Sequence, residues 1–419
     1  MQPLKYLQEF INTQNYLLKN NCFQFKFMRK FLFLFVFIFT IPLNAQSIYV
    51  EDRKIYVDGQ EYRVNGICYA RGEGNGENSG YSFNDDIPLL VDANINTIRT
   101  YAAITNATEL NAFANAGIKV IMMLNENSYT WYVNQFKDHP AILMWEFGNE
   151  FNYHPEWFGN NIQNWYDILE DRASTVKALD PNHPVSTGHG EVPDSQALNS
   201  CPSVDVWGMN IYRWLSPDSA IDELAAMTDK AMYISEAGAD SFNINSNSEN
   251  QAQQAQATEI ILNAIIDKSD ICIGVTLFEF CDEWWKAGNP NQQDPGGFSN
   301  AIPYDNFANE EYWGIVTRDR VPKLSYYVVQ EIYEATSLSV EEEPFNISIY
   351  PNPVSDGFIN IINPSNEYLN ISIYDMKGRE VRSQQIIFDS IDISDLSNGF
   401  FSLIVKSGKR STAKKIVVK

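Results

Sequence analysis

The chain has 419 residues, with 53 acidic and 30 basic side chains and a formal net charge of −23. This acidic excess excludes ordinary nucleic-acid binding, which needs a basic face to neutralise phosphates. Because 44% of the residues are apolar and 13% are aromatic, the chain can bury a large core and is too hydrophobic to be disordered throughout. Its length favours two domains.

The N-terminal segment has the pattern of a secretory signal. Met28-Arg29-Lys30 supplies positive charge, residues 31–39 form an apolar run, and Asn44-Ala45-Gln46 offers a small-residue cleavage site. That run is short for a bilayer span, so we expect no stable transmembrane span, with a retained anchor as the alternative. We interpret residues 1–27 as an over-called translation start and residues 28–45 as a signal peptide.

Four cysteines remain after that cleavage, and nothing in their spacing resembles a zinc site. Cys272 and Cys281 flank one strand candidate, which would hold them roughly 30 Å apart if extended, too far for a mutual disulfide. We expect free, buried thiols, although the sequence leaves the pairing of Cys68 and Cys201 open. No metal and no cofactor are expected.

Residues 46–340 alternate short apolar runs with amphipathic stretches, among them residues 107–116, 161–179 and 252–266. Eight buried strands with intervening helices over this length predict an α/β fold, a (β/α)₈ TIM barrel. A doubly wound open sheet is the alternative, but the glycine-rich residues 71–76 lack the following helix that a phosphate turn needs. The strand candidates are Tyr62–Tyr69, Asn96–Ala102, Lys119–Leu124, Ile142–Phe147, Pro184–Thr187, Val204–Asn210, Met232–Ser235 and Ile273–Phe280.

Two of these strands end in a glutamate, and a barrel places its chemistry at the carboxyl ends of its strands. The fourth runs into Glu150 and the seventh into Glu236. Cleavage of a glycosidic bond needs one carboxyl group to protonate the departing oxygen and another to attack or stabilise the anomeric carbon. Either glutamate alone would more commonly be a solvated surface group; together they indicate a glycosidase.

The sequence from Ala141 to Glu150, AILMWEFGNE, resembles the fourth-strand signature of clan A glycoside hydrolases. Residues 65–70, 96–101, 117–121 and 208–214 add matches in the expected order. The resemblance covers nearly all of residues 48–335. Within the clan it is most similar to the TIM-barrel part of family 2 enzymes and to the family 72 β-1,3-glucanosyltransferases.

The resemblance implies a role for each matching residue. Glu150 would be the general acid and then the general base, and Asn149 would bind the sugar 2-hydroxyl. Glu236 would be the nucleophile, giving a covalent glycosyl-enzyme and retention of configuration. Tyr212 and Arg99 would keep Glu236 ionised.

Simpler interpretations of the supporting residues stay open. Arg99 would equally pair with an inward-pointing Glu146, since a charge inside a barrel needs a partner. Tyr212 would also fit the core. His189, after the fifth strand, lies where related enzymes often place a substrate-binding histidine, or is a loop histidine of no consequence.

Aromatic residues in the connecting segments suggest sugar-stacking subsites, because apolar sugar faces pack on flat rings. Trp284 or Trp285 would floor the subsite where cleavage occurs, and about half of the group would serve loop packing instead. The long segment 286–312 predicts a wall or lid, and residues 238–254 would play a similar part. The rim candidates are Trp131, Tyr132, Trp157, Trp214, Trp284 and Trp285; Trp145, Trp165 and Trp207 are assigned to the core.

Two features depart from the nearest families. Family 2 enzymes carry sandwich domains before the barrel, and little sequence precedes the first strand here. Fungal family 72 enzymes are membrane-anchored, and an apolar C-terminal tail is missing here. The exact substrate, and hydrolysis versus transglycosylation, therefore stay open.

A second domain is expected at residues 345–419, after the acidic linker 341–344. Alternating strands divided by turn signals predict a small β-sandwich. Residues 350–353, 374–378 and 414–419 resemble the C-terminal sorting domain of type IX secretion, which implies export and the secretion machinery as a partner; a carbohydrate-binding sandwich is the alternative. The strand candidates are Phe345–Tyr350, Phe358–Ile362, Leu369–Tyr374, Arg379–Gln384, Ile386–Ile391 and Phe400–Lys406.

Together these features predict a secreted or surface-attached retaining β-glycosidase. Its substrate would be a polysaccharide or oligosaccharide, with endo attack on a β-glucan preferred by analogy. The acidic middle of the chain fits a neutral glycan better than a uronic one. The alternatives are an endo-β-mannanase of the same clan and a non-catalytic surface glycan-binding protein.

Overall fold

The computed structural model describes residues 47–70, 80–125, 127–338, 348–355, 357–362, 368–386, 389–407 and 410–419. The predictions for the translation start, the signal peptide, the linker 341–344 and the glycine-rich residues 71–76 lie outside the described residues.

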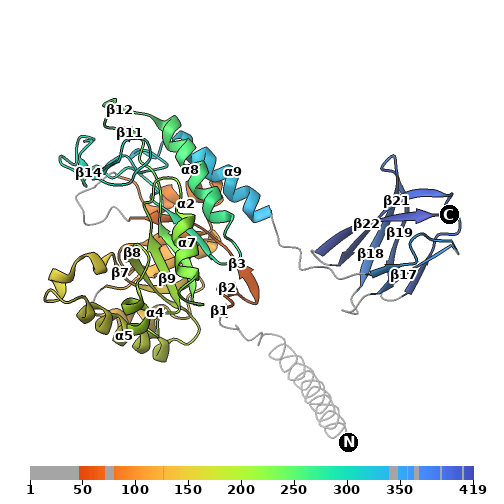
Figure 1. Ribbon diagram of the computed structural model, residues 1–419, viewed down its shortest axis with the longest axis horizontal. Helices are drawn as coiled ribbons and strands as arrows, with labels where there is room; N and C mark the ends of the chain where they lie inside the picture. Colours follow the sequence, from red (N-terminus) through yellow and green to blue (C-terminus); the bar gives the residue numbers. More distant parts are fainter. Residues whose placement is uncertain are drawn as a thin grey trace, which may run out of the picture.

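The predicted TIM barrel is confirmed. Eight parallel strands of the described chain close into a barrel, in which each strand pairs with the next along the sequence and β13 pairs with both β10 and β4. This closure contradicts an open doubly wound sheet (Figure 1). The strands are β4 (Val64–Tyr69), β5 (Thr97–Thr100), β6 (Lys119–Met123), β7 (Ile142–Asn149), β8 (Val185–Gly190), β9 (Val206–Asn210), β10 (Ala231–Glu236) and β13 (Gly274–Leu277).

Helices follow the strands and cover the outside of the barrel. The three predicted amphipathic stretches correspond to α3, α5 and α8, each of which begins at an asparagine whose side chain accepts a backbone N–H. Their apolar faces pack on the outer side of the strands in one large core. The helices are α2 (Phe83–Asp92), α3 (Ala107–Asn115), α4 (Tyr129–Phe136), α5 (Ile162–Leu179), α6 (Ser195–Ser200), α7 (Asp218–Ala225), α8 (Gln251–Ile266) and α9 (Leu324–Leu338).

A small antiparallel sheet closes the amino-terminal end of the barrel. It consists of β1 (Ile48–Glu51), β2 (Lys54–Val57) and β3 (Gln60–Tyr62). Ile48 and Ile55 pack against residues at the starts of several barrel strands. The predicted strand Tyr62–Tyr69 is therefore two strands, because β3 pairs with β2 and only β4 enters the barrel.

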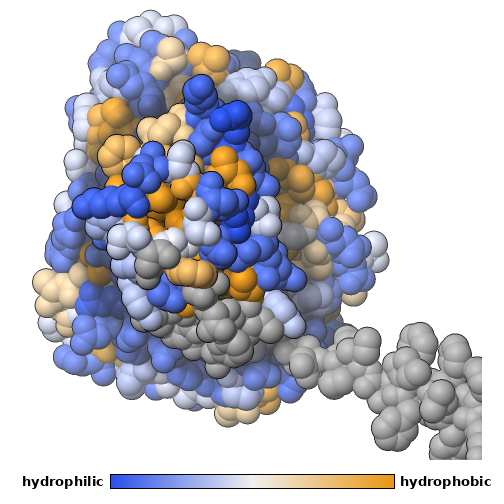
Figure 2. All heavy atoms as spheres, turned by 90° about the vertical axis from the view of Figure 1, so that its right-hand side faces the viewer, coloured by the Kyte–Doolittle hydropathy of each residue, from blue (hydrophilic) through white to orange (hydrophobic). Residues whose placement is uncertain are grey.

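The four cysteines are buried and free, as expected: Cys68, Cys201, Cys272 and Cys281. Among the described residues, no helix combines the length and apolar character that a membrane crossing requires. The face shown in Figure 2 carries mainly hydrophilic residues with smaller hydrophobic patches between them.

The C-terminal residues form two antiparallel sheets, β16-β17-β20 and β19-β18-β21-β22, drawn in blue in Figure 1. Apolar residues of both sheets share one core, so the predicted β-sandwich is confirmed. The closing strand β22 was not among the predicted strands. The strands are β16 (Ser348–Tyr350), β17 (Phe358–Ile362), β18 (Leu369–Asp375), β19 (Glu380–Ile386), β20 (Asp389–Asp392), β21 (Gly399–Ser407) and β22 (Arg410–Val418).

Candidate active site

One cavity of about 640 Å³ opens at the carboxyl ends of the barrel strands, and both predicted glutamates line it. Glu150 follows β7 directly and Glu236 is the last residue of β10. Asn149 and Tyr212 line the same cavity. The other lining residues are Ala70, Tyr101, Tyr153, Glu191, Asn210, Phe278, Glu279, Glu283, Trp285, Lys286, Phe298, Asn300, Ala308, Glu310 and Trp313.

The end of β7 is shaped to present Glu150. Gly148 has φ +73° and Glu150 has φ +56°, both in the left-handed region. A Cβ atom on residue 148 would lie 2.5 Å from a ring carbon of Trp165, so glycine is required there. The Glu150 amide donates to the carbonyl oxygen of Gly188 at 2.8 Å, which ties this turn to β8.

Arg99, which lies on β5, is fully buried beneath the cavity and connects three groups. It donates through Nε to Glu146 Oε1 at 2.6 Å, through Nη1 to Glu236 Oε1 at 2.8 Å, and through Nη2 to Asn149 Oδ1 at 2.9 Å. Burial by itself lowers the pKa of Arg99, but Glu146 and the other anionic partners raise it above the ordinary value. Arg99 therefore pairs with Glu146 and with Glu236 at the same time.

Glu236 accepts hydrogen bonds from three side chains. Besides Arg99, the hydroxyl of Tyr101 donates at 2.8 Å and that of Tyr212 at 3.0 Å. Burial, followed by charged neighbours that include Glu236, raises the pKa of both tyrosines well above the usual range, so they stay protonated and act as donors. The side chains of Arg99, Tyr101 and Tyr212 thus converge on the Glu236 carboxyl group and fix its orientation.

Tyr101 was missed by sequence analysis, although a signal for it exists. It lies two residues after Arg99, and residues two apart along a strand direction point to the same side.

Glu150 has the opposite environment. Burial raises its pKa to about 7, and the nearby Glu236 adds to the effect. At neutral pH a large fraction of this carboxyl group therefore carries its proton, as a general acid requires.

Asn149 is oriented by its neighbours. Its Oδ1 accepts from Arg99 and from Nδ2 of Asn210 at 3.1 Å, and Asn210 is itself held by the hydroxyl of Ser235 at 2.7 Å. Because the oxygen of Asn149 is used in this way, its amide N–H₂ is the group that can serve a ligand.

The segment after β13 and the predicted wall supply the far side of the cavity. Trp285, Lys286, Phe298, Asn300 and Glu310 all line it. Sequence analysis missed Phe278 and Glu279, which lie at the end of the eighth strand candidate. The sequence alone does not show whether a side chain at a strand end points into the cavity or away from it.

Besides Arg99, which is buried beneath the cavity, three other predicted substrate-site residues do not line it. His189 is 6% exposed, its Nδ1 lies 3.0 Å from the carbonyl oxygen of Glu191, and it packs on Trp207. Trp284 lies below the guanidinium of Arg318 at 4.7 Å. Trp214 contacts Tyr304 and is 39% exposed. Each side chain is turned aside by packing partners that only the fold brings near.

The segment 238–254 also lies outside the lining. Its strands β11 (Phe242–Asn243) and β12 (Ser248–Glu249) form a hairpin. Asp240 accepts from the side chain of Asn309 at 3.0 Å, so the segment braces the wall from behind.

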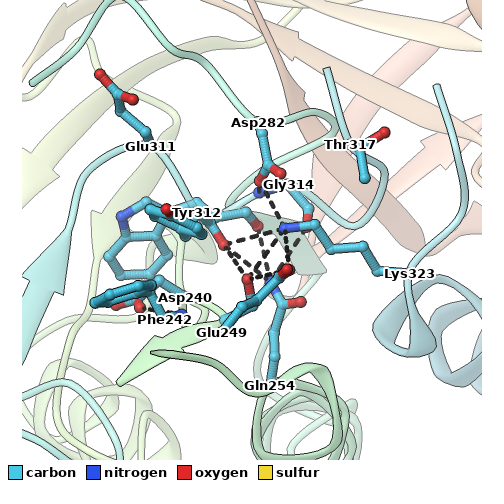
Figure 3. Close-up of polar contacts among 12 residues, drawn as sticks. Asp240, Phe242, Glu249, Gln254, Asp282, Glu311, Tyr312, Gly314, Thr317 and Lys323 are labelled. Atoms are coloured by element: carbon cyan, nitrogen blue, oxygen red, sulfur yellow. Dashed lines mark hydrogen bonds and ion pairs between the residues drawn. The ribbon is translucent and has the colours of Figure 1, made fainter. Parts of the chain in front are cut away.

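A buried lysine joins these pieces (Figure 3). Lys323, 0% exposed, donates to Asp282 Oδ1 at 2.7 Å and to the hydroxyl of Ser241 at 3.2 Å. Asp282 also accepts from the Gly314 amide at 3.0 Å. The hairpin segment, the start of the wall and its end are thus fastened at one point.

The segment from Glu279 to Glu310 places several glutamates around the cavity. Lys286 donates to Glu279 at 2.9 Å and pairs with Glu283 at 2.8 Å. Burial, followed by Glu283, raises the pKa of Glu279 well above its usual range, and burial raises the pKa of Glu310. Of the lysines and arginines in the described chain, Lys286 alone lines the cavity, beside six glutamates. No group of three His, Cys, Asp or Glu side chains suited to a metal ion occurs among the described residues.

Comparison with known families identifies the C-terminal part. Residues 348–419 match the family model of the secretion system C-terminal sorting domain. This domain marks the chain as a secreted or cell-surface protein, with type IX secretion as its route.

Comparison with curated proteins concerns a short stretch. The chain is 35% identical over 88 residues to mannan endo-1,4-β-mannosidase F of Aspergillus clavatus, which covers 19% of this chain and 19% of that protein. The chain thus matches only about a fifth of the length of this relative.

Solved structures with the same barrel are glycoside hydrolases of family 2. The galacturonate complex of the β-galacturonidase from Eisenbergiella tayi has a TM-score of 0.50 and 22% identity, over 69% of this chain and 54% of that one. β-Glucuronidase 2 of Bacteroides uniformis, covalently bound to cyclophellitol-6-carboxylate aziridine, has a TM-score of 0.52 and 15% identity, over 89% and 48%. These likenesses establish the barrel fold.

Proposed function

We propose that this chain is a retaining β-glycosidase in which Glu236 is the nucleophile and Glu150 the acid and base. The observation that carries the proposal is the contrast between two carboxyl groups in one cavity. Glu236 receives hydrogen bonds from Arg99, Tyr101 and Tyr212, whereas burial holds the pKa of Glu150 at about 7. Two carboxyl groups whose environments differ in this way divide naturally into base and acid.

In the first step, Glu150 gives its proton to the glycosidic oxygen while Glu236 attacks the anomeric carbon, which releases the leaving group and forms a glycosyl ester. In the second, Glu150 takes a proton from water, and the water displaces Glu236 with overall retention. The Asn149 amide donates to the sugar 2-hydroxyl, a contact that strengthens in the transition state. A sugar hydroxyl in place of water would give transglycosylation.

We propose a neutral β-linked polysaccharide as substrate, cleaved internally. Lys286, the one lysine or arginine that lines the cavity in the described chain, is already paired with Glu279 and Glu283, so this lining has no free cation to bind a sugar carboxylate. The two solved neighbours are named as a β-galacturonidase and a β-glucuronidase, whose names refer to uronic acids. The substrate proposed for this chain therefore differs from the sugars in those names. A β-glucan is the first candidate from the sequence; β-1,4-mannan is the second, favoured by the name of the Aspergillus relative.

The test assigns both roles by azide rescue. Glu236→Ala with azide should convert a 2,4-dinitrophenyl β-glycoside into the α-glycosyl azide, because azide enters from the nucleophile's side. Glu150→Ala should give the β-glycosyl azide, because azide then attacks the glycosyl-enzyme. Laminarin, cellulose and mannan, supplied to the native enzyme, identify the glycan by released reducing ends. An inverted product from the native enzyme, seen by NMR, would contradict the mechanism.

A further inference from the structure

Two exposed aromatic side chains lie in the segment directly after Glu150, and we call them the aromatic shelf: Tyr153 and Trp157. They belong to the short helices η1 (Phe151–Tyr153) and η2 (Pro155–Phe158), which follow Glu150 directly. Tyr153 lines the cavity and is 52% exposed, and Trp157 is 59% exposed. Both rings are therefore accessible to a ligand.

Trp157 is held in one orientation. Its indole stacks on the imidazole of His154, with ring centroids 3.9 Å apart and planes 7° from parallel, and meets the ring of Phe151 edge-on at 5.5 Å. The Nδ1 atom of His154 lies 2.9 Å from Glu156 Oε1. Although His154 covers one face of the indole and Phe151 meets it edge-on, the Trp157 side chain stays 59% exposed.

The loop that carries the shelf is anchored to the barrel. Asn152 exchanges two hydrogen bonds with Gly190 of β8, at 2.8 and 2.9 Å. The ring of Tyr153 lies against Gly190, where a Cβ atom would approach it to 2.3 Å. Phe151 packs on Trp165 of α5 at 4.8 Å. The shelf is thus formed before any ligand arrives, which reduces the entropy lost on binding.

We propose that the aromatic shelf binds the sugar units on the leaving-group side of the scissile bond. This rests on the proposed function, because the acid that protonates the departing oxygen faces the departing part of the glycan. Tyr153 contacts the first unit beyond that bond and Trp157 the next, each through an apolar sugar face. The ligand is an oligosaccharide chain of β-linked neutral hexoses, continuous with the sugar in the cavity.

The experiment compares Trp157→Ala with the native protein on mannopentaose and laminaripentaose in H₂¹⁸O, with mass spectrometry locating the cleaved bond. Loss of Trp157 should lower kcat/KM on the cleaved pentaose about tenfold, more than on the 4-nitrophenyl β-glycoside of the same sugar. Cleavage should also shift toward the reducing end, because fewer units are held on the leaving side. Trp157→Phe, which keeps a flat ring, should restore most of the native pattern.

Tyr49→Ala is the matched control, since Tyr49 is an exposed ring, 39% accessible, that stacks on Tyr56 at 5.0 Å in the sheet at the opposite end of the barrel. It should leave rate and cleavage position as in the native enzyme. An unchanged cleavage pattern in Trp157→Ala would overturn the shelf while leaving the proposed function intact.

Should the native protein cleave neither these pentaoses nor laminarin, cellulose or mannan, the proposed function fails, and a binding measurement then tests the shelf by itself. In gels containing mannan or laminarin, slower migration of the native protein than of Trp157→Ala supports the shelf. Equal migration of the two refutes it.

Discussion

At the scale of single residues, the site depends on how one buried arginine is shared. Arg99 reaches Glu146, Glu236 and Asn149 with different nitrogens. Glu146 is fixed in turn by Ser186 at 3.0 Å and by the hydroxyl of Tyr233. Room for the guanidinium comes from Gly188, where a Cβ atom would lie 2.3 Å from Arg99 Nη2. A buried cation with complete pairing orients its anionic partners as well as balancing them.

Glu150 gives a pH prediction at this scale. Its pKa is raised to about 7 by burial and then by Glu236, and the proposed acid acts when protonated. Activity on a polysaccharide, whose leaving group needs protonation, should therefore fall as pH rises through about 7. The measurement is the pH profile of kcat/KM.

Site-resolved NMR titration supplies an independent check. In Glu236→Gln the negative neighbour is gone, so the pKa of Glu150 should fall toward the ordinary carboxyl range. The assignment would be contradicted if kcat/KM of the native enzyme already fell with rising pH below pH 5. It would also be contradicted if the pKa of Glu150 were the same in Glu236→Gln as in the native protein.

At the scale of elements, the wall of the cavity relies on the buried pair of Lys323 and Asp282. Lys323 precedes α9, and Asp282 follows β13. Burial raises the pKa of Asp282 to about 6 although Lys323 opposes the rise.

Breaking this pair should loosen the wall. Lys323→Met should cost about 3–5 kcal/mol in the free energy of unfolding, because it leaves Asp282 buried without its cation. Since Trp285 and Lys286 lie just beyond Asp282 and line the cavity, KM should rise as well. Chemical denaturation and steady-state kinetics measure the two effects.

The double variant Lys323→Met/Asp282→Leu is the control. It removes both charges, so it should recover much of the lost stability. A single variant as stable as the native protein would show that the pair does not support the wall.

The elements also show where sequence patterns suffice. Apolar runs and helical periodicity located all eight barrel strands, because burial on both faces leaves a local mark on each strand. The boundary between β3 and β4 was missed, since a continuous run of residues does not reveal that its first part pairs with a separate sheet.

At the scale of the whole molecule, the residues that line the cavity all fall between Ala70 and Trp313, whereas the sorting domain begins at residue 348. The proposed catalytic site and the sorting domain therefore occupy different parts of the chain. The excess of negative charge favours solubility outside the cell and slows the approach of anionic glycans.

A variant that ends at residue 338 tests this division. Purified, it should keep the activity of the full chain on the identified glycan. Expressed in a cell with a type IX secretion system, it should stay in the periplasm, as shown by fractionation and immunoblotting. Full-length Glu236→Gln, inactive but with its sorting domain, should be exported normally; export of the truncated form would refute the assigned role of the domain.

The sequence by itself determined the barrel, the sorting domain and the two glutamates at strand ends, because strand period, turn residues and short motifs are local properties of the chain. Only the tertiary structure decided which side chains face the cavity. Tyr101 and Glu279 line it while His189 and Trp284 do not, since the direction of a loop side chain is set by packing partners distant in sequence. The environments of Glu150 and Glu236 were decided in the same way, because burial and charge are contributed by strands that meet only when the barrel closes.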